Sequence, residues 1–315
     1  LLSTLADIGI ILLFFFIGLE IHIGAVKKNL FQSTLISVFN TLSPLVAGFL
    51  FMKYLNYSDP VALIVGVSLS VSAQALALDV LDELGKTKSR IGQLIITAGL
   101  IDDLLELGLI AVILTIVHIT NVNPSVLQFG LEAIAVIVAF WILRKVIVPA
   151  IMKETEKQHA PAFILMGALV IALLMASFGE LFGVGTVIGA LGAGILVRHF
   201  LISENKRSWE EHALAKTLHD VSFGFFVPLF FVFIGMNTEL NVLVQQPLLV
   251  IVLIAITFIG TIGGTALAIR LTKGTWKEGF TAGWALNAKG DTELAIATLA
   301  LKNNLIPLEI FSAIV

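Results

Sequence analysis

Residues 91–119 form the stretch IGQLIITAGLIDDLLELGLIAVILTIVHI. It is long enough to cross the hydrocarbon core of a bilayer as one helix, which needs about 20 mostly apolar residues. Three acidic side chains, Asp102, Asp103 and Glu106, lie well inside it. Ionisable groups at that depth are costly to bury and indicate a functional site by default.

The rest of the chain has the same character. Hydrophobic residues make up 58% of it, charged residues 13%, and the mean hydropathy is +1.01, which excludes a water-soluble domain of this length. The absence of cysteine excludes disulfides and thiolate chemistry. We predict an all-α polytopic membrane protein with 10–11 transmembrane helices in this chain. Besides 91–119, the predicted spans are 4–23, 31–52, 61–81, 126–148, 162–178, 184–202, 219–236, 247–271 and 278–301, with another beginning after Pro307.

The basic residues predict the orientation of these helices. All Lys and Arg residues except Lys53, Lys289 and Lys302 lie in, or beside, the loops that follow the first, third, fifth, seventh and ninth predicted helices. Because cytoplasmic loops carry an excess of Lys and Arg, we expect a multi-pass protein of the cell membrane with these loops in the cytoplasm. Lys289 falls inside the tenth helix, where a cation suggests a function.

An internal repeat suggests how the helices are organised. Residues 14–19 read FFFIGL and residues 231–236 read FVFIGM, and the two predicted helices that carry them run in opposite directions. This is typical of the inverted repeats of secondary transporters. We therefore expect a first repeat over 1–120, a linker helix and cytoplasmic loop over 121–160, and a second repeat over 161–315.

The same offset aligns two helices that are both interrupted by polar residues. Residues 68–74 read SLSVSAQ in the third predicted helix, and residues 287–293 read NAKGDTE in the tenth. Paired broken helices near the bilayer midplane indicate a transport site, because the unwound backbone offers carbonyl groups and helix ends to an ion. We predict two crossed, discontinuous helices.

The acidic pair supplies the chemistry for exchange. A carboxylate in a low-dielectric site beside a like charge can hold either a proton or a cation near neutral pH. Carboxylate, hydroxyl and carbonyl oxygens suit hard cations such as Na⁺ or K⁺ rather than transition metals. Glu106 lies one helical turn beyond the pair, and we interpret it as a third ligand or as a solvated residue that lines the entry path.

Several stretches together resemble the cation:proton antiporter-2 family of Na⁺/H⁺ and K⁺/H⁺ antiporters. The resemblance covers nearly the whole chain and implies a homodimer, a mobile core that works by alternating access, and about two helices before Leu1, hence about 13 in a full protein that is longer at both ends. The stretches that carry it are FIGLE at 16–20, SLSVS at 68–72, LDELG at 81–85, the Asp102-Asp103 pair, PLFF at 228–231, IGM at 234–236 and NAKG at 287–290.

This resemblance also implies roles for individual residues. Asp103 would bind the Na⁺, K⁺ or proton, with Asp102 as its partner and Ser72 as a hydroxyl ligand. Lys289, with the acidic Asp291 and Glu293, would support the crossing helices by neutralising their dipole ends. Electrogenic relatives have a lysine where this chain has Thr261, so either exchange is electroneutral or Lys289 supplies the missing charge.

Two other stretches have simpler interpretations. The glycine-rich run GVGTVIGALG at 183–192 does not have the spacing of a phosphate-binding loop and predicts close helix packing in lipid. Residues 153–157, KETEK, are expected to form a solvated cytoplasmic loop.

Two other functions are compatible with some of these features. A channel-like K⁺ efflux system would use the same pore helices without obligatory proton exchange. An intramembrane aspartyl protease would need two catalytic aspartates, such as Asp103 and Asp291, but would leave Asp102 and the paired breaks unexplained. The acidic pair could also be only a structural cluster. We expect a secondary active antiporter in a lipid bilayer, not an enzyme, with no cofactor and no nucleic-acid partner.

Overall fold

The computed structural model describes residues 2–20, 30–73, 77, 80–81, 83–122, 141–156, 161–181, 186–203, 216–290 and 292–315. The regular elements within these ranges are all helical, as the sequence predicts. Their bounds are α1 Leu2–Glu20, α2 Leu30–Tyr54, α3 Asp59–Ser70, α5 Arg90–Val122, η1 Leu143–Ile147, α7 Val148–Glu156, α8 Pro161–Leu181, α9 Thr186–Ser203, η2 Ser222–Phe226, α11 Val227–Asn237, α12 Asn241–Gln245, α13 Pro247–Leu271, α14 Trp276–Leu286, α15 Thr292–Lys302 and α16 Leu308–Ile314.

Several of the described helices can cross a membrane. By length and composition, five are long and apolar enough, and each coincides closely with a predicted span. They cover Leu2–Leu19, Leu30–Tyr54, Ala162–Leu181, Lys216–Asn237 and Pro247–Leu271. The helix α5 is longer still, and it carries the three acidic side chains of residues 91–119.

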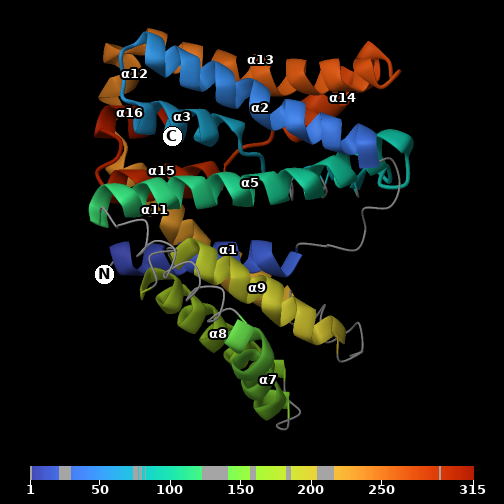
Figure 1. Ribbon diagram of the computed structural model, residues 1–315, viewed down its shortest axis with the longest axis vertical. Helices are drawn as coiled ribbons and strands as arrows, with labels where there is room; N and C mark the ends of the chain where they lie inside the picture. Colours follow the sequence, from blue (N-terminus) through green and yellow to red (C-terminus); the bar gives the residue numbers. More distant parts are fainter. Residues whose placement is uncertain are drawn as a thin grey trace. The chain divides into compact units, whose positions relative to one another are not determined.

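The chain divides into two compact units, each drawn from separated parts of the sequence. Unit 1 contains Leu1–Ile21 and Leu114–Met236, and unit 2 contains His22–Ile113 and Asn237–Val315. Figure 1 shows the helices of each unit coloured along the sequence.

Unit 1 is held together by close contacts between helix backbones. The helix α9 packs against α1 and α8. A Cβ atom added at Gly194 would lie 2.1 Å from the carbonyl oxygen of Phe15, and one at Gly189 would lie 2.1 Å from that of Met175. The interpretation of this glycine-rich run as a packing surface is therefore confirmed for Gly189, while residues 182–185 lie outside the described residues.

The fifth predicted helix ends later than expected. Of the predicted span 126–148, the part from 141 onwards is described, and it is helical through a π-helical turn and then through α7 to Glu156. The prediction of a loop at 153–157 is therefore wrong for 153–156. Ile151 and Met152 continue the apolar face that packs in the core of unit 1, while Lys153 is exposed, so the helix continues to Glu156.

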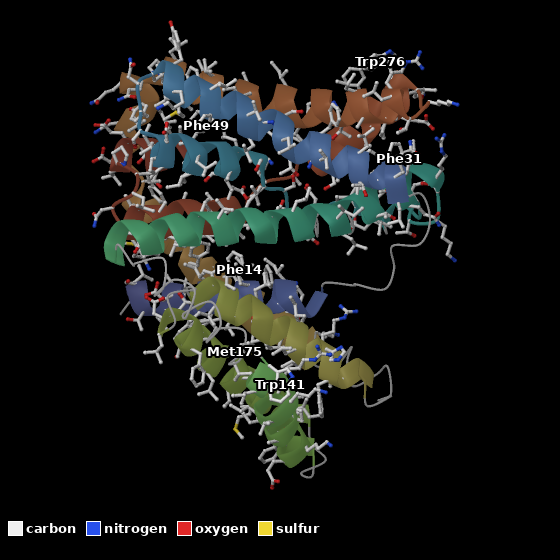
Figure 2. The ribbon with its side chains drawn as sticks, in the orientation of Figure 1. Phe14, Phe31, Phe49, Trp141, Met175 and Trp276 are labelled. Atoms are coloured by element: carbon white, nitrogen blue, oxygen red, sulfur yellow. The ribbon has the colours of Figure 1, made fainter. Side chains whose placement is uncertain are left out.

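In unit 2, α2 packs against both α3 and α13, and α13 packs against α14 (Figure 1). Glycines bring α2 and α13 close together, since a Cβ atom added at Gly264 would lie 2.4 Å from the carbonyl oxygen of Phe39. Phe31 lies at the start of α2 and Trp276 at the start of α14, and Figure 2 shows both at the same end of the unit. Both rings are exposed, as is typical of aromatic residues at a membrane interface.

Both predicted interruptions are present in unit 2. The helix α3 ends at Ser70, and Val71 has extended backbone angles of φ −66° and ψ 144°. The tenth predicted span is divided into α14 and α15, and Gly290 between them has φ of 147°, which L side chains rarely adopt. The backbone N–H of Ala73 donates to the carbonyl oxygen of Ala288 at 2.8 Å, so the two breaks touch each other.

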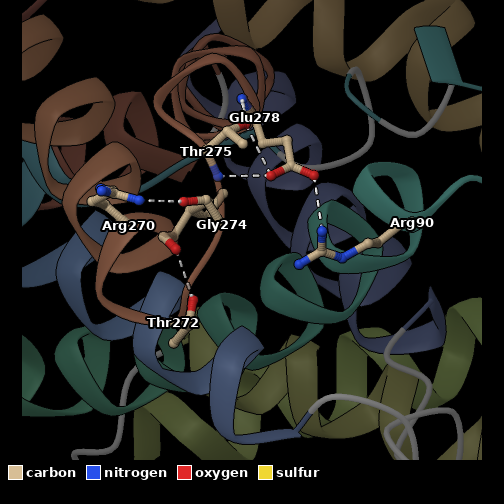
Figure 3. A network of polar contacts seen from close by, with 7 residues as sticks. Arg90, Arg270, Thr272, Gly274, Thr275 and Glu278 are labelled. Atoms are coloured by element: carbon tan, nitrogen blue, oxygen red, sulfur yellow. Dashed lines mark hydrogen bonds and ion pairs between the residues drawn. The ribbon is translucent and has the colours of Figure 1, made fainter.

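The turn between α13 and α14 is fixed by a separate polar network (Figure 3). Thr275 and Glu278 form a capping box at the start of α14, in which each side chain bonds the backbone N–H of the other residue. A carboxylate oxygen of Glu278 also lies 3.0 Å from the guanidinium of Arg90, the first residue of α5. This network ties the start of α5 to the start of α14.

Candidate functional site

The centre of the site is the carboxylate of Asp102 on α5. Its side chain is 1% exposed. It accepts a hydrogen bond from Ser37 Oγ at 3.2 Å, one from Asn40 Nδ2 at 2.9 Å, and one from Thr41 Oγ1. A buried carboxylate needs such donors because it has left water. All three donors come from α2, so they fix Asp102 against that helix.

The sequence analysis did not identify these α2 residues, although the sequence contains a pattern of polar residues that indicates them. Ser33, Ser37, Asn40 and Thr41 recur at helical spacing within a mostly apolar helix, and all four are buried. Residues at such steps share one face of a helix. A buried polar stripe of this kind predicts an intramembrane polar partner, which here is Asp102.

Asn40 joins four parts of unit 2. Its Nδ2 donates to Asp102 Oδ2 and lies 3.3 Å from Ser72 Oγ, in the break that follows α3. Its Oδ1 accepts a hydrogen bond from Thr265 Oγ1 of α13 at 3.3 Å. One amide therefore links α2, α5, α13 and the first break.

Two ionisable side chains bind the break itself. Glu106 Oε1 accepts the backbone N–H of Ser72 at 2.6 Å. Lys289 Nζ donates to the carbonyl oxygen of Val71 and lies 3.5 Å from Ser72 Oγ. The structure thus brings together Asp102, Glu106, Ser72 and Lys289, all of which the sequence predicted for the site.

The two remaining acidic residues of α5 differ in their surroundings. Asp103 follows Asp102 in the helix and is partly exposed. Glu106 is 5% exposed, so in this conformation it is not a solvated residue of an entry path.

The other predicted residues occupy the surroundings of the site. Thr261 is completely buried on α13, one turn before Thr265, and its hydroxyl has no hydrogen-bond partner among the described residues. Glu293 is buried in the first turn of α15, where a negative charge favours the helix N-terminus. Asp291 lies outside the described residues.

Chemically, this arrangement offers oxygen atoms of several kinds in a mostly buried place. They are the carboxylates of α5, the Ser72 hydroxyl and the carbonyl group at the end of α3. Oxygen atoms of these types suit a hard monovalent cation, and the carboxylates can also take a proton.

Comparison with known proteins agrees with a site for a monovalent cation and a proton. The whole chain, residues 1–315, matches the family described as "Sodium/hydrogen exchanger, transmembrane". The Na⁺/H⁺-K⁺ antiporter GerN of Bacillus cereus is 27% identical over 315 residues, which is all of this chain and 79% of that protein. The probable Na⁺/H⁺ antiporter 3 of Methanocaldococcus jannaschii is 30% identical over 319 residues, again covering all of this chain and 79% of that protein.

A solved structure has the same fold. The sodium proton antiporter MjNhaP1 of Methanocaldococcus jannaschii superposes with a TM-score of 0.68 at 16% sequence identity, over 99% of this chain and 82% of that one. This likeness supports an all-α polytopic fold for the chain.

Proposed function

This chain belongs to the sodium/hydrogen exchanger family of transmembrane proteins and is a monovalent cation:proton antiporter, and we propose that Asp103 on α5 carries the exchanged ion. The protein is a transporter rather than an enzyme. Of the two other functions, neither the channel-like efflux system nor the aspartyl protease is favoured by the relatives, which are named antiporters.

The different positions of the two aspartates support this assignment. Asp102 is fully buried and already accepts three hydrogen bonds from α2. Asp103 is the partly exposed member of the pair. An ion or proton that arrives from water therefore reaches Asp103 more easily, while Asp102 holds the helix in place and contributes negative charge.

Exchange follows from competition for one site. Asp103 binds a proton on one side of the membrane and Na⁺ or K⁺ on the other, with Asp102 and Ser72 as additional oxygen groups. Because the site holds one or the other, movement of the core couples the two gradients. The names of the relatives include both Na⁺/H⁺ and K⁺/H⁺ antiporters, so we propose Na⁺ or K⁺ as the cation.

Thr261 bears on the stoichiometry. A threonine cannot take part in a proton cycle, so one cation would exchange for one proton without net charge movement. Lys289, which bonds the first break, would support the crossing helices together with Glu293 and Asp291. Supporting this role, Lys289 lies near enough to Asp102 for electrostatic attraction.

The larger architecture is also proposed. We place the protein in the cell membrane with its basic loops in the cytoplasm, as a homodimer built on inverted repeats over 1–120 and 161–315 with a linker over 121–160. The matching interruptions after Ser70 and Leu286 support the repeat, because they fall at corresponding positions of the two halves.

The test is exchange in proteoliposomes that contain a pH-sensitive dye. Wild type and Asp103→Asn would be compared after addition of Na⁺, K⁺, Li⁺ or choline, with valinomycin clamping the potential. We expect Na⁺- or K⁺-dependent proton movement in the wild type and its loss in Asp103→Asn. Normal exchange by Asp103→Asn would disprove the site assignment, and cation flux without proton movement would indicate a channel.

A further inference from the structure

We propose that Glu106 is a positioning residue for this exchange, which holds the backbone of Ser72 in the first break. This inference rests on the proposed function, since it concerns how the proposed site is kept in shape. It differs from the interpretation of Glu106 as a third ion ligand.

The backbone hydrogen bonds of the break show what Glu106 replaces. The N–H of Val71 still bonds the carbonyl oxygen of Val67, and the N–H of Ala73 bonds Ala288 of the second break. Between them, the N–H of Ser72 bonds Glu106 Oε1 at 2.6 Å. A buried N–H without an acceptor is costly. The carboxylate of Glu106 therefore provides the acceptor that the helix no longer offers where it ends.

Holding this N–H also sets the position of the Ser72 hydroxyl. Ser72 is 3% exposed, and its Oγ lies 3.3 Å from Asn40 Nδ2 and 3.5 Å from Lys289 Nζ. Both neighbours are donors, so the hydroxyl oxygen is directed by its surroundings. Since the backbone of Ser72 is fixed by Glu106, removal of that bond would displace a proposed ligand of the cation.

The experiment compares Glu106→Gln with Glu106→Met, because the amide keeps an acceptor oxygen and the thioether does not. The matched control is Glu309→Gln, which removes an exposed carboxylate on α16. Exchange would be measured in proteoliposomes from pH 6 to 9 to give the maximal rate and the KM for Na⁺ or K⁺ of each variant. Thermal unfolding and size-exclusion chromatography would report folding.

We expect Glu106→Gln to keep its maximal rate and cation KM within about threefold of wild type, and Glu106→Met to lose about tenfold or more in rate. Glu309→Gln should leave rate, KM and pH profile unchanged.

Other results would overturn the inference. If both variants raise the cation KM by about tenfold or more to the same extent, Glu106 is a ligand. If Glu106→Met matches wild type, Glu106 does not hold Ser72. If Glu106→Met does not fold, Glu106→Gln decides alone, and a loss of about tenfold or more in its rate would overturn the inference. Absence of exchange in the wild type would instead refute the proposed function.

Discussion

Ala73 donates its backbone N–H to the carbonyl oxygen of Ala288 at 2.8 Å, so the two interrupted helices are bonded to each other where both are unwound. Each break therefore depends on the shape of the other. A change in the backbone of either break should therefore displace groups of the site in both breaks.

Gly290→Ala should destabilise the second break. Gly290 has φ of 147°, and a side chain there is strained although an added Cβ would meet nothing within 4 Å. We expect a loss of about 1–3 kcal/mol in stability and a lower exchange rate. Thermal unfolding and proteoliposome exchange would measure both. Gly263→Ala on α13 is the control, because it also has open space but lies within a regular helix; equal effects of the two variants would contradict the prediction.

Asn40→Ala should disconnect the site from α2 and α13. The change removes a donor from Asp102 and the acceptor for Thr265, leaving buried polar groups with fewer partners. The expected cost is about 1–3 kcal/mol in unfolding free energy, with a clear loss of exchange. Asn241→Ala, at an exposed position on α12, should change neither. A fully active and stable Asn40→Ala protein would show that the amide is dispensable.

Thr261→Lys should make exchange depend on the membrane potential. Thr261 is fully buried one turn from Thr265, whose hydroxyl bonds Asn40 beside Asp102. A lysine there would be stable only if its charge is paired, and Asp102 is the expected partner. Exchange measured with and without a valinomycin clamp would show the added charge movement. If a folded Thr261→Lys variant exchanges ions independently of the membrane potential, Thr261 is not the reason for electroneutral exchange.

Thr275→Ala should lower stability without altering ion exchange. The substitution removes the capping box of α14, in which Thr275 Oγ1 accepts the backbone N–H of Glu278. Loss of such a cap costs about 1 kcal/mol. Thr281→Ala in the same helix is the control, because its hydroxyl bonds only the preceding turn at Lys277. A large change in the cation KM of Thr275→Ala, or a large drop in its exchange rate, would mean that this turn takes part in transport.

Much of the fold could be predicted because the bilayer restricts it. Apolar stretches of spanning length predicted the helices, and polar runs inside two of them predicted the breaks that the structure places after Ser70 and Leu286. The late end of the fifth helix could not be predicted in this way. Its charged residues suggested a loop, but packing of Met152 in the core of unit 1 extends the helix.

The site was harder to predict in detail. Neighbouring residues of a helix point about 100° apart, so the sequence could not tell which of Asp102 and Asp103 faces α2. The polar stripe of α2 was not recognised, and such a stripe marks one face of a helix without naming the residue that it contacts. The bond from Ser72 to Glu106 depends on backbone angles inside a break, for which no periodic pattern exists.

The contact of Lys289 with the first break has one more consequence. Its ammonium group bonds the carbonyl oxygen of Val71 and lies 3.5 Å from the hydroxyl oxygen of Ser72. An ammonium group is chemically a tethered monovalent cation. Any Na⁺ or K⁺ that takes Ser72 as a ligand must therefore compete with a cation that never leaves the protein, so occupancy is an exchange of two positive charges rather than the filling of a vacant place.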